Sequence, residues 1–290
     1  MFLKKIVKNV ISMLGYEIRR KKVFRSSNTI SQNAISKKHH GFIGDDVVLL
    51  LNSSDDMYVK NHKERIILSI EICRKFNFNK RILNVGGGEW GPITQAWQKS
   101  FLDAEFIPTD VDLHGKLPYD DDSFDNVIFC EVFEHIGDRN FMSSYKNFEG
   151  VINLVSEIIR VMKPGAKMLL TTPNIISYYN IGLALCSTHP FMYPLHYREY
   201  SPYEMKTMLD FFGVNTLLLE THDVFSGYHD RLGDTIHKFC IKNGFSVDFR
   251  GRHFFIVVEK PEGYALPKIP KDTAHIFYKD NKREKFKNPL

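Results

Sequence analysis

The sequence predicts an α/β protein with a doubly wound, mostly parallel sheet covered by helices on both faces. Two observations predict this class. Short apolar runs alternate with helix-periodic segments over about 200 residues, and a glycine-rich turn joins the first run to the following helix. Hydrophobic residues make up 43% and charged residues 25% of the 290 residues, so the chain can bury a sizeable core.

The predicted elements follow one another in a regular order from residue 63 to residue 261. Apolar side chains recur at helical spacing in four segments: 63–76, 93–102, 151–165 and 201–213. Short apolar runs typical of buried strands lie between and after them, at 80–85, 104–110, 125–133, 166–174, 216–224 and 253–261. Pro92 and Ser201 mark helix starts, and Pro164–Gly165 marks a helix end.

One domain, residues 61–262, contains this alternation. Residues 1–24 place apolar side chains on one helical face and lysines on the other, which predicts a basic amphipathic helix. That helix either lies on an anionic membrane through residues 1–22 or docks on the protein body or a second subunit. Residues 25–60 lack lasting periodicity and are predicted to be a linker, and residues 263–290 form a basic C-terminal tail.

The basic charge of the chain lies mainly at its ends. There are 39 Lys and Arg against 34 Asp and Glu, and residues 1–40 hold ten of the basic residues and one acid. A surface built for nucleic acid carries its charge on the folded domain, so nucleic acid is not an expected partner. No segment has the roughly 18–20 apolar residues that cross a bilayer. The four cysteines show no metal or disulfide spacing, so we expect a cytoplasmic protein.

A glycine turn suggests a cofactor site. Gly86, Gly88 and Gly91 follow the first predicted strand and precede a helix, and Asp110 ends the next strand. Glycines let the backbone approach a ligand closely, the helix N-terminus offers free N–H groups, and the carboxylate can accept both ribose hydroxyls. The arrangement predicts a nucleotide-type cofactor, and NAD(P) and S-adenosylmethionine both fit it.

Two longer segments distinguish these cofactors. LPYDDDSFDNVIFCEVFEHI starts at Leu117, and RVMKPGAKMLLTTPN starts at Arg160. In these motifs and their order the chain resembles, over residues 80–260, the class I S-adenosylmethionine-dependent methyltransferases, in the branch that includes bacterial surface-polysaccharide enzymes. The resemblance implies S-adenosylmethionine as cofactor and a Rossmann-like methyltransferase fold with a sheet of the seven-stranded type.

The resemblance also implies which residues bind the cofactor. The glycine loop lies under its methionine part, an aspartate holds the ribose, a leucine packs near the adenine, and a glutamate lines the cleft. The residues carried over are Asn84, Gly86, Gly87, Gly88, Asp110, Asp112, Leu117 and Glu131.

The chain departs from the family pattern in three places. Asn84 stands where the family usually has an acid, and Trp90 occupies the usual third glycine position. Few residues separate Asp110 from Leu117, so the strand that normally intervenes is shortened or absent, and Asp112 is a substitute for either of the family's acids.

Methyl transfer to a hydroxyl requires a base that takes the hydroxyl proton, a task that suits histidine. The candidates are His135, whose alternative role is to shape a turn, and His196. An acceptor-side insertion at about 174–202, implied by the resemblance, adds three candidate substrate-binding residues: His189, Arg198 and Tyr200. Arg198 either clamps a phosphate or carboxylate or pairs with a nearby acid. The acidic run Asp120–Asp122 is interpreted as a turn, so no metal site is predicted.

The acceptor is suggested by resemblance alone. The phrases MLGYEIRR and THPFMYPLHYREYS look like those of enzymes of bacterial surface-polysaccharide assembly. They imply O-methylation of a sugar, nucleotide sugar or lipid-linked glycan at the inner face of the plasma membrane. A small-molecule or lipid-quinone methyltransferase is one alternative, and a non-catalytic methyltransferase-fold binding protein is another. The sequence leaves the oligomeric state open.

Overall fold

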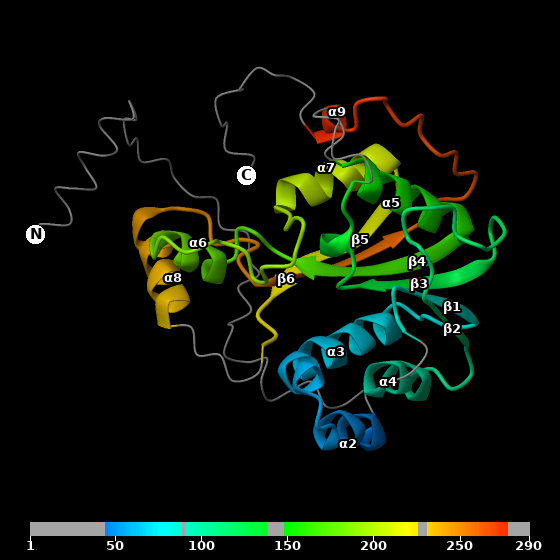
Figure 1. Cartoon of the computed structure of the whole chain (residues 1–290), viewed down its shortest axis with the longest axis horizontal. Helices are drawn as coiled ribbons and strands as arrows, with labels where there is room; N and C mark the ends of the chain where they lie inside the picture. Colours follow the sequence, from blue (N-terminus) through cyan, green and yellow to red (C-terminus); the bar gives the residue numbers. More distant parts are fainter. Residues whose placement is uncertain (1–43, 89–90, 139–147, 226–230, 278–290) are drawn as a thin grey trace, which may run out of the picture. The chain divides into compact units, whose positions relative to one another are not determined.

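The computed structural model describes residues 44–88, 91–138, 148–225 and 231–277 (Figure 1). The predicted N-terminal helix and Trp90 lie outside these ranges. Of the helices within them, none combines the length and the apolar character required to span a bilayer.

A six-stranded sheet with the order β2-β1-β3-β4-β6-β5 forms the centre of the fold (Figure 1). The first four strands run parallel, and β6 runs antiparallel to both of its neighbours. The predicted strands and the predicted fold class are confirmed. The strands are β1 (Arg81–Val85), β2 (Glu105–Thr109), β3 (Phe124–Cys130), β4 (Met162–Pro173), β5 (Asn215–His222) and β6 (His253–Glu259).

The seven-stranded sheet implied by the resemblance is not what the described residues form. After β2 the chain makes a compact turn, in which the Asp112 carboxylate accepts a hydrogen bond from His114 N at 3.0 Å. Leu117 N then donates to Glu157 of the next helix at 2.9 Å. The segment between Thr109 and Leu117 is too short for a helical crossover and a further strand, so β2 is the edge of the sheet.

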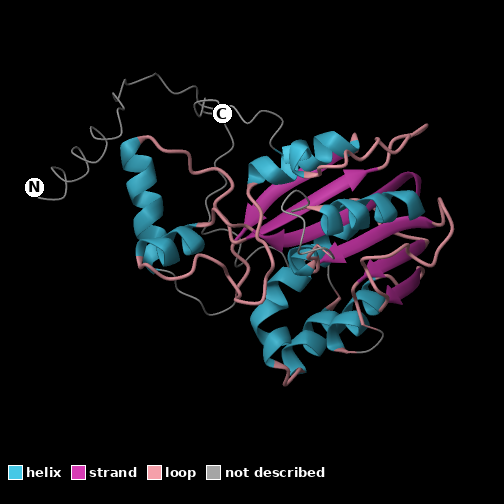
Figure 2. Cartoon of the chain, turned by 45° about the horizontal axis from the view of Figure 1, so that its top comes forward, coloured by secondary structure: helices cyan, strands magenta, loops and turns pink. Residues whose placement is uncertain are grey.

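Helices cover both faces of the sheet (Figure 2). Because side chains of a strand alternate between faces, Leu83 and Phe129 enter the core on one side, and Ile82 and Ile128 enter the core on the other. The first core packs against α5 (Glu149–Val161), α7 (Pro202–Phe212) and the short α9 (Ala274–Phe277). The second packs against α2 (Asp45–Ser53), α3 (Met57–Lys75) and α4 (Pro92–Ser100).

The last part of the predicted linker, residues 25–60, is helical in the structure. Helix α2 buries Val47 and Leu51 in the second core, and α3 begins at Met57 with Asp56 as its N-cap. The Asp56 side chain accepts a hydrogen bond from Tyr58 N at 2.8 Å. Helix α2 has only nine residues, too few to show a clear period in the sequence.

The predicted insertion contains a helix, α6 (Tyr178–Leu185), which packs with α8 (Arg231–Asn243). Tyr178, Ile236 and Cys240 form a small separate apolar cluster between them. Helix α8 was not predicted. In Figure 1 this helix pair lies beyond the carboxyl ends of the parallel strands.

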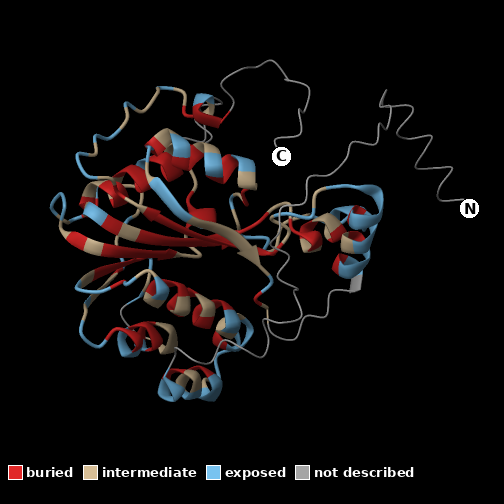
Figure 3. Ribbon diagram, turned by 180° about the vertical axis from the view of Figure 1, so that it is seen from behind, coloured by how far each residue is buried: buried red, intermediate tan, exposed pale blue. Residues whose placement is uncertain are grey.

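Part of the predicted C-terminal tail, the short helix α9, contributes side chains to the core. Phe277 is buried, and its ring stacks on Phe148 with the centroids 4.0 Å apart. Figure 3 shows buried residues continuing into this short helix. The basic residues that follow lie outside the described part of the chain.

Candidate functional site

A cavity of about 310 Å³ opens where the glycine turn leaves β1. Three segments line it: α3 from its N-cap to Ser69, the end of β1 and the turn with the beginning of α4, and the residues that end β3. Parallel strands place their carboxyl ends at one edge of the sheet, which is the usual position of a ligand cleft in open α/β folds.

Each glycine of the turn has a separate steric role. Gly86 has a φ of +71°, and a Cβ on it would stand 2.6 Å from the Val132 side chain. A Cβ on Gly87 would stand 1.7 Å from Asn84 Nδ2. Around the Cβ position of Gly88, by contrast, no atom of the described residues lies within 4 Å. The first two glycines allow the turn to pack, and the third keeps the cavity open.

Asn84 lies beneath this turn, as predicted. Its side chain is buried, contacts the Gly87 backbone position and lines the cavity. The turn is also held from the other side, because Thr94 Oγ1 donates to the Gly88 carbonyl at 2.8 Å. The structure thus places Asn84 against the glycine turn, and its contact with the cofactor stays a prediction.

Glu131 lines the cavity and belongs to a buried ionic network. It follows β3 with a left-handed backbone, φ +56°. Arg65 Nη1 lies 3.1 Å from one of its carboxylate oxygens, His253 Nε2 lies 3.1 Å from the other, and Thr171 donates to it at 2.8 Å. Burial, and then the charge of Arg65, hold the pKa of His253 well below its usual value, so this histidine is neutral.

Arg65 is a site residue that the sequence reasoning missed. It lies in α3, is almost fully buried, and also donates to the Tyr58 hydroxyl at 3.0 Å. The available signal was a single arginine within the apolar pattern of the helix predicted at 63–76. A buried arginine of this kind needs a buried acid, which here is Glu131.

The remaining cofactor candidates do not line the cavity. Asp110 is exposed at the end of β2, and Asp112 is engaged in the turn with His114. Leu117 is fully buried in the core on the α5 side of the sheet, and its packing near the adenine stays a prediction. The compact turn after β2 draws this leucine inward.

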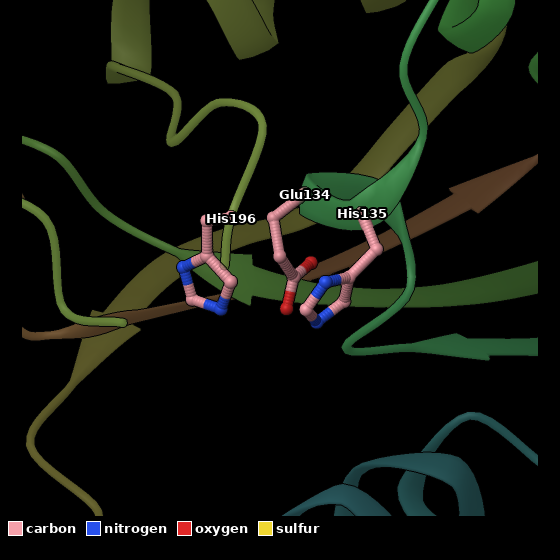
Figure 4. Close-up of side chains that lie close together, drawn as sticks. All are labelled: Glu134, His135 and His196. Atoms are coloured by element: carbon pink, nitrogen blue, oxygen red, sulfur yellow. The ribbon is translucent and has the colours of Figure 1, made fainter. Parts of the chain in front are cut away.

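The two predicted catalytic histidines lie together. Glu134, His135 and His196, here called the Glu134 cluster, bring one carboxylate oxygen and two imidazole nitrogens within 4.8 Å of one another (Figure 4). Glu134 and His135 belong to the 3-10 turn η2 (Phe133–His135), and His196 comes from the loop after α6. Burial raises the pKa of Glu134, and Thr172 Oγ1 donates to its carboxylate at 2.9 Å.

A buried glutamate orients His196. Nδ1 of His196 lies 2.8 Å from Glu199 Oε1, and Glu199 Oε2 accepts a hydrogen bond from Asn180 Nδ2 at 2.7 Å. Met192 N also donates to Glu199, at 2.6 Å. The His135 ring lies edge-on to the His196 ring, with the centroids 4.9 Å apart. Burial, and then His196, lower the pKa of His135, which favours a neutral imidazole.

The predicted substrate-binding residues are placed differently from one another. His189 is exposed, whereas Arg198 pairs with Glu204 and lies over the Phe148 ring, 4.3 Å from its centroid. This matches the alternative prediction for Arg198, a pair with a nearby acid. The prediction that Tyr200 binds a sugar hydroxyl is wrong, because the side chain is buried in the core. Burial also raises the pKa of Tyr200.

Part of the chain is similar to known methyltransferases. Residues 91–170 match the family model described as a methyltransferase domain, and no curated protein matches. A SAM-dependent methyltransferase from Archaeoglobus fulgidus shares 17% identity over 71% of this chain and 100% of its own, with a TM-score of 0.47. A possible histamine N-methyltransferase from Thermotoga maritima shares 12% identity over 69% of this chain and 91% of its own, with a TM-score of 0.43. Phosphoethanolamine N-methyltransferase 2 from Haemonchus contortus shares 15% identity over 67% of this chain and 52% of its own, with a TM-score of 0.42.

The matched segment begins at the glycine turn and extends through the compact turn and β3 into β4. It therefore includes Glu131, Glu134 and His135, whereas His196 lies outside it, and of the glycine turn it includes only Gly91. The match identifies residues 91–170 as a methyltransferase domain, and the sheet order and the glycine turn are compatible with it.

Proposed function

We propose that the enzyme transfers a methyl group from S-adenosylmethionine to a hydroxyl of a sugar or glycan in the synthesis of a bacterial surface polysaccharide. The observation that carries the proposal is the pair of His196 and Glu199, 2.8 Å apart, beside His135 and Glu134. This arrangement suits an acceptor that must lose a proton as it reacts.

The residues of the cavity fit the cofactor. S-adenosylmethionine supplies a methyl group on a sulfonium, and its methionine end carries one carboxylate and one ammonium group. The open space at Gly88 accommodates a ligand against the backbone, and Arg65 and Glu131 offer the two opposite charges in the same cavity. Glu131 also compensates for the missing acid at Asn84, because it brings a carboxylate to the same turn.

A hydroxyl acceptor explains why a polar cluster is needed here. The acceptor oxygen forms the new C–O bond, the electron pair of the broken C–S bond stays on sulfur, and the hydroxyl proton must leave. A sugar hydroxyl does not ionise near neutral pH, so a group that removes or loosens its proton accelerates the step. The cluster that contains His196, held by Glu199, is the candidate for that role.

Exposed aromatic side chains near the cluster favour a sugar. Tyr193 and Tyr197 flank His196 in the sequence and are 48% and 61% exposed. The Tyr193 ring centroid lies 5.5 Å from that of His196. Sugars bind well to such rings, because their C–H faces pack on the ring and their hydroxyls reach the surrounding polar groups.

The location of the reaction is part of the proposal. A lipid-linked glycan or nucleotide sugar is available at the inner face of the plasma membrane. The predicted basic helix of residues 1–24 suits peripheral contact with anionic lipid there. Liposome flotation of the full chain with and without residues 1–22 tests this contact, and equal flotation of both would contradict it.

An acceptor panel tests the function. The full chain is incubated with methyl-labelled S-adenosylmethionine and nucleotide sugars, lipid-linked glycans or a demethylated quinone, and the products are identified by mass spectrometry. Label in a sugar hydroxyl is the expected result. Label in the quinone alone would overturn the sugar proposal in favour of a quinone methyltransferase. The variant Gly86→Ala, with a strained turn, is the negative control.

A further inference from the structure

We propose that the Glu134 cluster binds one divalent transition-metal cation through a carboxylate oxygen of Glu134 and imidazole nitrogens of His135 and His196. The binding of the ion stands on the geometry of the cluster. Its use in catalysis rests on the proposed function, since the ion would then activate the acceptor hydroxyl.

The arrangement of the three side chains suits an ion. The Glu134 carboxylate lies beside the two imidazole rings, and the three side chains extend in the same direction (Figure 4). Protein ligands surround such a cation at about 2.0–2.2 Å, which brings neighbouring ligand atoms to about 3.0–3.5 Å from one another. The 4.8 Å spread must therefore shrink by roughly 1–2 Å, within the reach of small side-chain rotations.

The surroundings of His196 provide a second, independent observation. A metal-bound histidine usually donates its other ring N–H to a carboxylate or carbonyl, which fixes the tautomer and aims the free nitrogen at the ion. Glu199 occupies that position, 2.8 Å from Nδ1, and is itself fixed by Asn180 and by the Met192 N–H. Nε2 of His196 is thereby left for the ion.

The burial of the carboxylate also favours a cation. Glu134 is 1% exposed, and Thr172 Oγ1, a neutral donor, orients its carboxylate. A buried carboxylate is costly without an opposite charge, and a divalent ion bound between Glu134 and the two histidines supplies that charge.

The chemistry of the ligands selects the class of metal. Two imidazoles and one carboxylate suit Zn²⁺, Fe²⁺, Co²⁺ or Mn²⁺, whereas Mg²⁺ and Ca²⁺ favour oxygen ligands. Three protein ligands leave coordination positions for the acceptor. A hydroxyl at such a position becomes more acidic and releases its proton to solvent, so His196 acts as a metal ligand in place of a general base.

Direct measurement of metal binding tests the site. The full chain, stripped with a chelator that is then removed, is titrated with Mn²⁺ under electron paramagnetic resonance and with Co²⁺ under visible absorption. We expect one ion per chain. His135→Gln and His196→Gln should each weaken binding about tenfold or more, because each removes a ligand. The matched control is His275→Gln, which changes a histidine of α9 that is 68% exposed and should leave the affinity unchanged.

The outcomes separate the metal site from the proposed function. Absence of Mn²⁺ and Co²⁺ binding at millimolar concentration would overturn the site, as would equal binding by both histidine variants and the control. Methylation of a sugar that proceeds unchanged in chelator, with no ion bound, would refute the catalytic use of the ion and keep the function. Binding of the ion by a chain that methylates only a quinone would refute the sugar proposal and keep the site.

Discussion

The side-chain amide of Asn84 lies directly under the backbone of Gly87, so closely that a Cβ there would stand 1.7 Å from Nδ2. One of the residues that depart from the family pattern is thus the one on which the glycine turn rests. Asparagine forms this packed contact without the charge of the usual acid, and the cavity obtains a carboxylate from Glu131.

Two glycine substitutions should separate stability from cofactor binding. Gly87→Ala forces Asn84 out of place and should lower the free energy of unfolding by about 1–3 kcal/mol. Gly88→Ala meets open space and should leave stability unchanged, yet weaken S-adenosylmethionine about tenfold or more, because the methyl group occupies the cavity. Urea denaturation and calorimetry provide the two readouts. Gly115→Ala, outside the cavity, is the control, and a Gly88→Ala variant with normal cofactor affinity would contradict this account.

The pair of Arg65 and Glu131 should be essential for folding as well as for the cavity. Arg65→Met leaves Glu131 buried beside a neutral His253, which should cost about 3–5 kcal/mol. The double variant Arg65→Met/Glu131→Gln removes both charges and should recover a large part of that loss. Chemical denaturation of the single and double variants measures their free energies of unfolding. Equal destabilisation of the two variants would show that the charge pairing is not the cause.

Removal of the carboxylate behind His196 should affect turnover rather than cofactor binding. Glu199→Gln keeps the shape but loses the negative charge at Nδ1, so turnover should fall about tenfold or more at saturating acceptor. Affinity for S-adenosylmethionine should remain unchanged, because Glu199 does not line the cavity. Asp210→Asn, an exposed acid paired with Lys206, is the control. Normal turnover in Glu199→Gln would contradict the role assigned to this glutamate.

Stability should fall in mild acid. Burial, then Arg65 and His253, lower the pKa of His62 to about 3, and burial lowers that of His253 as well. The unfolded chain, with ordinary histidine pKa values near 6.5, therefore takes up more protons than the folded chain below that pH. The free energy of unfolding should decrease as the pH drops from 7 to 5.

A histidine variant checks this pH dependence. His62→Gln removes one of the histidines with a lowered pKa and should make the decrease shallower, whereas His275→Gln should follow the wild-type curve. Urea denaturation at several pH values gives the slopes. An identical slope in His62→Gln and the wild type would refute the assignment to His62.

The sheet could be predicted from the sequence because its central strands are buried on both faces, so they appear as continuous apolar runs such as 80–85 and 253–261. Helix α8 could not, since it buries few side chains, Ile236 and Cys240 among them, against the neighbouring α6. An element that packs mainly on another short helix leaves little periodic signal in its own sequence.

The same contrast holds for the site. The glycine turn, Glu131 and His135 could be predicted because they belong to motifs next to strand ends, and His196 because it belongs to the loop phrase THPFMYPLHYREYS. Glu199 could not, since its role depends on Asn180, 19 positions earlier in the chain, and on the fold that joins them. Tyr200 and Leu117 stand in family motifs, but the packing directs both side chains into the core.

Calorimetric titration of the full chain with S-adenosylmethionine and S-adenosylhomocysteine tests the central claim most directly. The account predicts one site for each compound on the chain, with both affinities reduced in Gly88→Ala and kept in Gly115→Ala. Failure of both compounds to bind at millimolar concentration, or equal binding by wild type and Gly88→Ala, would contradict the assignment of the glycine turn as the cofactor site.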